Sequence, residues 1–201
     1  MHKEPYARLL VMISEELKHE SWNEEDWHYI KSLSEAIENV HSKFIFINKD
    51  VSQYHLEHIF AYELYYKWKV ILKRKGGNPQ KLLLNGELTK HYCKTSIYRF
   101  PDLVLHKDYK NIGNEGYQCI ICEIKSSRNS IKSKDLKKDI NSLYGGITEL
   151  FYKCGVFIYL GDNTNRMISR LRKIKEELEI DSEKRIIFVG VNGYEPHYEI
   201  L

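Results

Sequence analysis

Three ionisable residues stand at the ends of two apolar segments, and their types and spacing are those of a site for a divalent cation. Asp102 directly precedes an apolar run, and Glu123 and Lys125 close a second one that begins near Tyr117. In an antiparallel hairpin, the start of one strand lies beside the end of the other. Because Glu123 and Lys125 are two residues apart, they share one face of their strand. The sequence therefore predicts that two carboxylates and one ammonium group meet at one edge of a sheet.

The surroundings of these groups favour a bound cation. Ile120, Ile121 and Ile124 predict a dry setting, where bare carboxylates are costly and where close carboxylates raise one another's pKa. A bound Mg²⁺ (or Mn²⁺) removes both problems, since these ions prefer oxygen ligands in octahedral geometry and keep several waters. A lysine beside a cation in dry surroundings has a lowered pKa and could then act as a base.

A further acid is expected from a helix upstream. Glu63 interrupts an apolar stripe at helical spacing, which is unusual unless its carboxylate reaches a partner or an ion. The stripe consists of Leu56, Ile59, Phe60, Lys67 and Val70. Glu57 lies on an adjacent line of the same helix and is the weaker candidate.

Hydrophobic periodicity and turn residues predict an α/β protein. Two helices are expected within residues 5–40, a short strand or linker at 43–47, and a helix at 51–75. An edge strand near 92–98 and strands at 102–106 and 117–125 come next. The chain is then expected to continue with a helix at 134–153, a strand at 156–160, a helix at 165–179 and a last strand at 185–191. This order indicates one mixed sheet with helices on both faces.

Composition sets limits on the class of protein. The 201 residues are enough for one domain with a hydrophobic core. The net charge of +3 does not by itself indicate a polyanionic partner. No signal peptide is recognisable, and no apolar run approaches the roughly 20 residues that span a bilayer. We therefore expect a cytoplasmic protein without a membrane partner.

A basic run follows the predicted site. Arg128, Lys132, Lys134 and Lys138 are candidates for contact with nucleic-acid phosphates. Asp135 and Asp139 interleave with these lysines, so a solvated helix face is an equally good interpretation. The helix at 51–75 is itself crowded with tyrosines, for which helix packing is the favoured interpretation and base stacking the other. The basic residues at its end are explained by interaction with the helix dipole, with nucleic-acid contact as the alternative.

With Pro101-Asp102 and Glu123-Ile124-Lys125, the chain resembles the PD-(D/E)xK nuclease superfamily, which has the restriction-endonuclease-like fold. The resemblance covers about residues 51–160 and implies an α-β-β-β-α-β core. It gives residues 51–201 as the nuclease-like domain and 1–50 as an N-terminal helical extension.

The resemblance also implies a function and a set of roles. It implies metal-dependent hydrolysis of phosphodiester bonds in nucleic acid, with DNA the expected substrate of an endonuclease. Asp102, Glu123 and the backbone carbonyl of Ile124 would bind Mg²⁺ or Mn²⁺. Lys125 would position or deprotonate the attacking water, and Glu63 would hold a metal-bound water or a second ion. Cutting both strands of a duplex would favour a homodimer.

Two alternatives stay open at this level. The chain could be a binding or interaction module of the same fold that binds nucleic acid without cutting it. It could also be a metal-free structural protein in which Asp102 and Lys125 form a simple ion pair. Metal-dependent cleavage and metal-dependent stability separate these alternatives from a nuclease.

Overall fold

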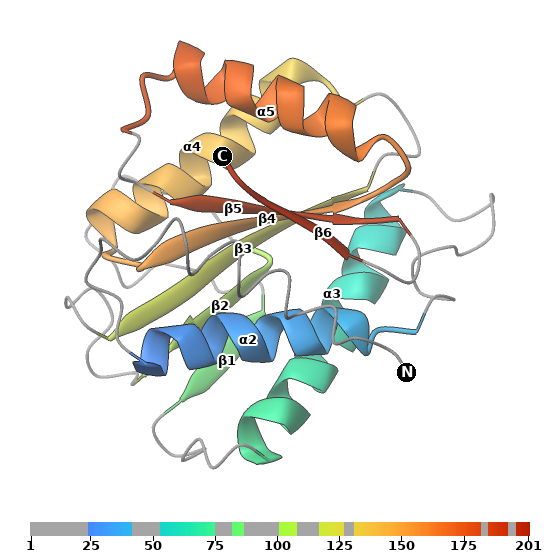
Figure 1. Cartoon of the computed structure of the whole chain (residues 1–201), viewed down its shortest axis with the longest axis vertical. Helices are drawn as coiled ribbons and strands as arrows, with labels where there is room; N and C mark the ends of the chain where they lie inside the picture. Colours follow the sequence, from blue (N-terminus) through green and yellow to red (C-terminus); the bar gives the residue numbers. More distant parts are fainter. Residues whose placement is uncertain are drawn as a thin grey trace.

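The structure is a computed structural model that describes residues 24–41, 53–74, 82–86, 101–107, 117–126, 131–181, 185–192 and 196–201. Within these residues the chain forms one six-stranded sheet with helices on both faces (Figure 1). The predicted α/β class and mixed sheet are confirmed. The helices are α2 (Glu24–Glu38) and α3 (Gln53–Arg74) on one face, and α4 (Ser133–Glu149) and α5 (Thr164–Glu177) on the other.

The sheet runs in sequence order from β1 to β6. Its strands are β1 (Leu83–Gly86), β2 (Leu103–His106), β3 (Gln118–Ser126), β4 (Cys154–Leu160), β5 (Ile186–Val191) and β6 (Pro196–Ile200). Neighbours are antiparallel from β1 to β3, parallel from β3 to β5, and antiparallel again between β5 and β6. Strands β4 and β5 are buried throughout, as strands covered by helices on both faces are.

The predicted elements from residue 51 onward agree with the structure to within a few residues, with two differences. The expected last strand at 185–191 is followed by a further strand, β6, whose proline at its first position and half-exposed side chains gave little strand signal. The edge strand expected near 92–98 lies outside the described residues, and the edge strand that the structure describes is β1. The first expected helix and the segment at 43–47 also lie outside the described residues.

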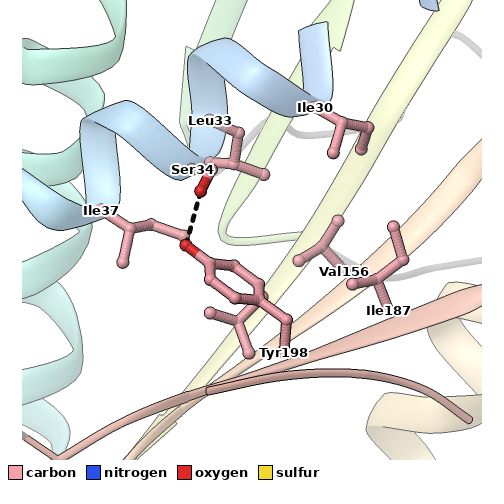
Figure 2. A pocket seen from close by; sticks show the side chains of 8 residues that line it. Ile30, Leu33, Ser34, Ile37, Val156, Ile187 and Tyr198 are labelled. Atoms are coloured by element: carbon pink, nitrogen blue, oxygen red, sulfur yellow. Dashed lines mark hydrogen bonds between the residues drawn. The ribbon is translucent and has the colours of Figure 1, made fainter. Parts of the chain in front are cut away.

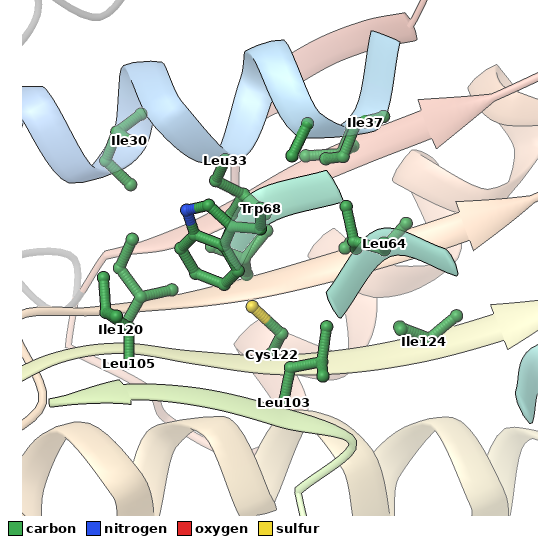
Figure 3. Packing of buried hydrophobic residues seen from close by; sticks show 14 of the residues in the cluster. Ile30, Leu33, Ile37, Leu64, Trp68, Leu103, Leu105, Ile120, Cys122 and Ile124 are labelled. Atoms are coloured by element: carbon green, nitrogen blue, oxygen red, sulfur yellow. The ribbon is translucent and has the colours of Figure 1, made fainter. Parts of the chain in front are cut away.

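The rotational position of α3 is set by its packing against the sheet and α2. Its buried side chains are Leu56, Phe60, Leu64, Trp68, Ile71 and Leu72. Figure 3 shows Trp68 and Leu64 directed toward Leu103 and Cys122 of the sheet. The Trp68 indole Nε1 donates a hydrogen bond of 2.8 Å to Ser32 Oγ on α2. Helix α2, which falls within the expected N-terminal extension, thus shares the core that holds α3.

Helix α4 packs on the opposite face of the sheet through an apolar stripe. Leu136, Ile140 and Leu143 are fully buried there and lie in one cluster with Ile121 of β3. A Cβ atom at Gly146 would lie only 2.6 Å from Ile121 Cδ1. Glycine at this position therefore lets the helix approach β3 closely, which brings the polar side chains of α4 within reach of those on β3.

A small cavity between α2 and the sheet is too small to be a ligand site. Its volume is about 10 Å³, roughly that needed for one water molecule. The lining is mostly aliphatic, and the hydroxyls of Ser34 and Tyr198 face each other across it in a hydrogen bond of 2.6 Å (Figure 2). This contact ties α2 to the edge strand β6.

No helix among the described ranges combines the length and apolarity required to cross a membrane.

The link between α2 and α3 predicts a stability difference between two aromatic positions of α3. Trp68→Phe removes buried ring volume and leaves Ser32 without its indole donor, so we expect the free energy of unfolding to fall by about 2 kcal/mol. Tyr66→Phe is the matched control because Tyr66 is 61% exposed, and it should change stability by less than about 0.5 kcal/mol. Urea denaturation measures both, and equal losses would contradict the packing described for α3.

Candidate active site at the β2–β3 hairpin

Asp102 and Glu123 lie side by side at one end of the sheet. Strands β2 and β3 are antiparallel, with Leu103 opposite Cys122, so the register extended by one residue places Asp102 opposite Glu123. Directly opposed residues have Cβ atoms about 5 Å apart. The Ile124 amide donates a hydrogen bond of 2.6 Å to Asp102 Oδ2, which fixes the aspartate against β3. The predicted hairpin juxtaposition is therefore confirmed.

The same register places Pro101 opposite Ile124, and this bears on the carbonyl of Ile124. The N–H and C=O of a strand residue point to the same side of the strand, and the Ile124 N–H points toward Asp102. Its carbonyl therefore points toward Pro101, which has no N–H to donate. Among the described residues, β2 therefore presents no backbone donor to the Ile124 carbonyl oxygen, which lies next to the two carboxylates.

Glu123 and Lys125 share one face of β3, as their spacing predicted, and both reach α4. Ser142 Oγ donates a hydrogen bond of 3.0 Å to Glu123 Oε1. The Lys125 Nζ atom lies 3.6 Å from Asp139 Oδ2 on α4 and 3.8 Å from Glu57 Oε2 on α3. Lys125 therefore bridges the helices on the two faces of the sheet, and its close ion pairs are with these two acids rather than with Asp102. The alternative of a simple Asp102–Lys125 ion pair does not describe this arrangement.

Four carboxyl groups face one ammonium group in this cluster, which consists of Glu57, Asp102, Glu123, Lys125 and Asp139. Burial raises the pKa of Asp102 to about 6, and the repulsion from Glu57 adds to it, against the lowering effects of the Ile124 amide and Lys125. Burial likewise raises the pKa of Asp139 to about 6. Glu123 is 6% exposed, and burial followed by repulsion from Asp102 and Asp139 raises its pKa. These groups carry more negative charge than Lys125 compensates.

Lys125 keeps its proton in this setting. Burial lowers its pKa, but the carboxylates of Asp139, Glu57, Asp102 and Glu123 together outweigh burial and raise it. The lowered pKa expected from the sequence would need a cation close to the ammonium group. Without one, Lys125 acts as a charged donor and not as a base.

Glu57, not Glu63, is the acid that α3 brings to the cluster. Glu57 Oε1 accepts a hydrogen bond of 2.8 Å from the Ser126 amide, and its other oxygen pairs with Lys125. Glu63 pairs instead with Lys67 one turn away on its own helix, at 3.4 Å. Six residues separate the two acids, which places them about 120° apart around the helix and about 9 Å apart along it.

The sequence interpretation chose the wrong face of α3 because this helix has apolar or aromatic residues on all sides. The expected face shares Leu56 and Phe60 with the buried face, but it also contained Ile59, Glu63 and Val70. The buried face continues instead through Leu64, Trp68 and Ile71. Hydrophobic periodicity cannot set the phase of such a helix, since exposed tyrosines carry the same signal as buried residues.

Asp139 is a site residue that the sequence interpretation treated as part of a solvated surface. It is 7% exposed, and it falls between Leu136, Ile140 and Leu143 in the buried stripe of α4. An acid inside an apolar stripe is rarely buried without a partner, so this position carried a detectable signal. The alternating charges around it in the sequence obscured that signal.

The candidate nucleic-acid contacts lie near the start of α4 as far as they are described. Lys132 directly precedes α4, Lys134 and Lys138 belong to it, and all three are exposed. Lys138 acts electrostatically on Asp139, so it is close to the cluster. Arg128 lies outside the described residues.

The donors at Asp102 and Glu123 fit a small divalent cation with few protein ligands. Among the described residues, no group of three or more His, Cys, Asp or Glu side chains is arranged to hold a metal ion. Glu57 and Asp139 are engaged by Lys125, which leaves Asp102 and Glu123 as a pair, each with one carboxylate oxygen bound by a donor and one available. Mg²⁺ commonly binds to one or two carboxylates and fills its remaining positions with water, so two carboxylates and the Ile124 carbonyl fit it.

The raised pKa values predict how stability depends on pH when no cation is present. Between the unfolded pKa of about 4 and the folded value of about 6, the folded state binds more protons at Asp102, so stability falls as pH rises through this window. Asp102→Asn retains an acceptor for the Ile124 amide, but its side chain does not ionise, so it lacks the fall in stability that the parent shows as pH rises. Its stability relative to the parent should therefore grow from pH 4 to pH 7, by up to about 3 kcal/mol.

Urea denaturation in EDTA at several pH values measures this difference. Asp162→Asn serves as the control because it removes a carboxylate from an exposed position. If the difference in unfolding free energy between Asp102→Asn and the parent stays constant from pH 4 to pH 7, the pKa of Asp102 is not raised by folding.

No family model, curated protein or solved structure matches this chain. What the protein does is therefore inferred from the geometry and electrostatics of the cluster.

Proposed function

We propose that the protein is a Mg²⁺- or Mn²⁺-dependent nuclease that hydrolyses phosphodiester bonds of nucleic acid, with DNA as the expected substrate of an endonuclease. The observation that carries the proposal is the meeting of Asp102 and Glu123 across the β2–β3 hairpin, with Lys125 at the same end of the sheet. The element order α3-β1-β2-β3-α4-β4 supports the restriction-endonuclease-like arrangement that the sequence resemblance implies.

Asp102, Glu123 and the Ile124 carbonyl would hold the cation. When bound, the cation lowers the pKa of its water and stabilises the negative charge that develops on the phosphate. Because the carboxylates are buried, few water molecules compete with them for the cation. Their mutual repulsion favours a cation that binds between them. Ser142 and the Ile124 amide hold the two carboxylates in place.

Lys125 would place its ammonium group beside the reacting phosphate and the attacking water. In the cation-free site the surrounding acids keep Lys125 protonated, and a charged Lys125 would donate a hydrogen bond and offset negative charge. Glu57 and Asp139 hold the ammonium group from the two faces of the sheet and so restrict where it points. These two acids are positioning residues in this proposal.

The exposed lysines of α4 would contact the nucleic-acid backbone next to the site. Lys132 directly precedes α4, and Lys134 and Lys138 lie in its N-terminal half, as does Asp139, which reaches the cluster. Phosphate contacts of this kind set position without reading sequence. Cutting both strands of a duplex would require two such sites and hence a homodimer.

Metal-dependent cleavage is the direct test of the proposed activity. Plasmid and oligonucleotide DNA should be cut with Mg²⁺ or Mn²⁺ and left intact in EDTA. Asp102→Ala and Lys125→Ala should each slow cleavage by at least about 100-fold, because each removes charge stabilisation from the transition state. Gel analysis of the products measures the rates, and variants that cut as fast as the parent would rule out this site.

Two further readouts separate the nuclease from the alternatives. A silent binding module would bind DNA equally well with and without EDTA and cut nothing. A metal-free structural protein would gain no stability from Mg²⁺, whereas a cation bound at a hundredfold excess over its Kd adds about 2.7 kcal/mol. Thermal unfolding with and without Mg²⁺ measures that gain, which Asp102→Ala should remove.

The placement of the helical acid predicts unequal effects of two neutral substitutions on α3. Glu57→Gln loses the ion pair with Lys125 and should lower the cleavage rate by about tenfold to a hundredfold, as loss of a residue that supports a catalytic group does. Glu63→Gln is the matched control, because its carboxylate pairs with Lys67, and it should cut at the parental rate. The reverse order of effects would show that the sequence interpretation of α3 was right and that the placement described above is wrong.

A further inference from the structure

Helix α3 carries an exposed face of aromatic and basic side chains on the side away from the core. Tyr62 is 68% exposed and Tyr66 is 61% exposed, and Lys69 and Lys73 are exposed as well. Positions i, i+4, i+7 and i+11 fall within about 60° of one another around a helix. These four residues therefore form one continuous stripe, here named the Tyr–Lys face.

The Tyr–Lys face begins beside the candidate active site. The rings of His58 and Tyr62 stack, with centroids 6.4 Å apart and an interplanar angle of 30°. His58 directly follows Glu57, which pairs with Lys125, and it is near enough to Asp102 to interact with it electrostatically, so His58 lies close to the carboxylate pair. The stacked rings thus connect the site to the stripe that runs along α3.

The charge of α3 suits a polyanion. From Lys67 to its end at Arg74, the helix has four cationic residues and no acid. Attraction to the helix dipole accounts for cations in the last turn, such as Lys73 and Arg74. It does not account for Lys69, which lies over the Tyr65 ring at 5.3 Å, nor for two large rings left in water. Aromatic faces interleaved with cations are the arrangement on which unpaired bases and their phosphates bind.

We propose that the Tyr–Lys face of α3 binds single-stranded nucleic acid, with bases stacked on Tyr62 and Tyr66 and phosphates contacted by Lys69 and Lys73. The inference rests on the proposed function in one respect, namely that the bound strand continues past His58 toward Asp102 and Glu123. Bases in a duplex are already stacked on one another, so a flat ring on a helix surface reaches only unpaired bases. Single strands, flaps and frayed ends are therefore the substrate class that this surface selects.

Fluorescence anisotropy with a labelled 20-nucleotide oligothymidylate, in EDTA so that no cleavage occurs, tests the proposal. The double variant Tyr62→Ala with Tyr66→Ala should lose about tenfold or more in affinity. Tyr62→Phe with Tyr66→Phe should restore it, since stacking needs the ring and not the hydroxyl. Tyr117→Ala is the matched control, because Tyr117 is 40% exposed just before β3, at the end of that strand far from Lys125.

Salt dependence supplies an independent readout for the lysines. For single strands, the slope of log K against log[salt] falls by about 0.7 for each phosphate contact that is removed. Lys69→Gln with Lys73→Gln should therefore lower this slope by about 1.4 and leave the preference for single strands unchanged. A 20-base-pair duplex should bind the parent more weakly than the oligothymidylate does.

The outcomes separate this inference from the proposed nuclease. If the parent cuts DNA but the double alanine variant binds oligothymidylate as tightly as Tyr117→Ala does, the inference is overturned and the nuclease stands. If affinity depends on the two rings but nothing is cut in Mg²⁺ or Mn²⁺, the inference stands and the nuclease is overturned. A parent that does not bind the oligonucleotide, or that prefers the duplex, overturns the inference as well.

Discussion

The candidate site is built around the juxtaposition of Asp102 and Glu123 at one end of the sheet. The antiparallel register of β2 and β3 brings the two carboxylates together, and the Ile124 amide fixes one of them. Burial and mutual repulsion make this arrangement costly, as the raised pKa values of both groups show. Such a cost is typical of a site that is organised for a charged ligand rather than for stability alone.

The helices on the two faces of the sheet complete the cluster from opposite sides. Glu57 reaches Lys125 from α3, and Asp139 reaches it from α4. Each helix is placed by its apolar packing, α3 through Trp68 and α4 through its close approach at Gly146. The position of the Lys125 ammonium group is thus a consequence of both halves of the core, and it ties the stability of the fold to the geometry of the site.

Proline at position 101 has a local explanation in this arrangement. It occupies the position opposite Ile124, where any other residue would have an N–H to donate to the Ile124 carbonyl. With proline there, position 101 offers no N–H to the carbonyl oxygen, which lies beside the carboxylates. One backbone atom and two side chains from adjacent strands therefore form a set of oxygen donors at this end of the sheet, between α3 and α4.

Residue patterns alone are enough to predict the sheet class, the two strands of the hairpin, and the convergence of Asp102, Glu123 and Lys125 at one end of the sheet. These follow from local features: consecutive apolar residues make a strand, and spacing along it decides which side chains share a face. Which other acids join this cluster depends on how the helices pack against the sheet. Helix α3 has apolar or aromatic residues all round, so the choice of Glu57 over Glu63 depended on how Phe60, Leu64 and Trp68 pack against the sheet. Asp139 lies among alternating charges in the sequence, which indicate an exposed face. Its burial follows from the packing of α4 against β3, because the face that a helix buries is set by its neighbours.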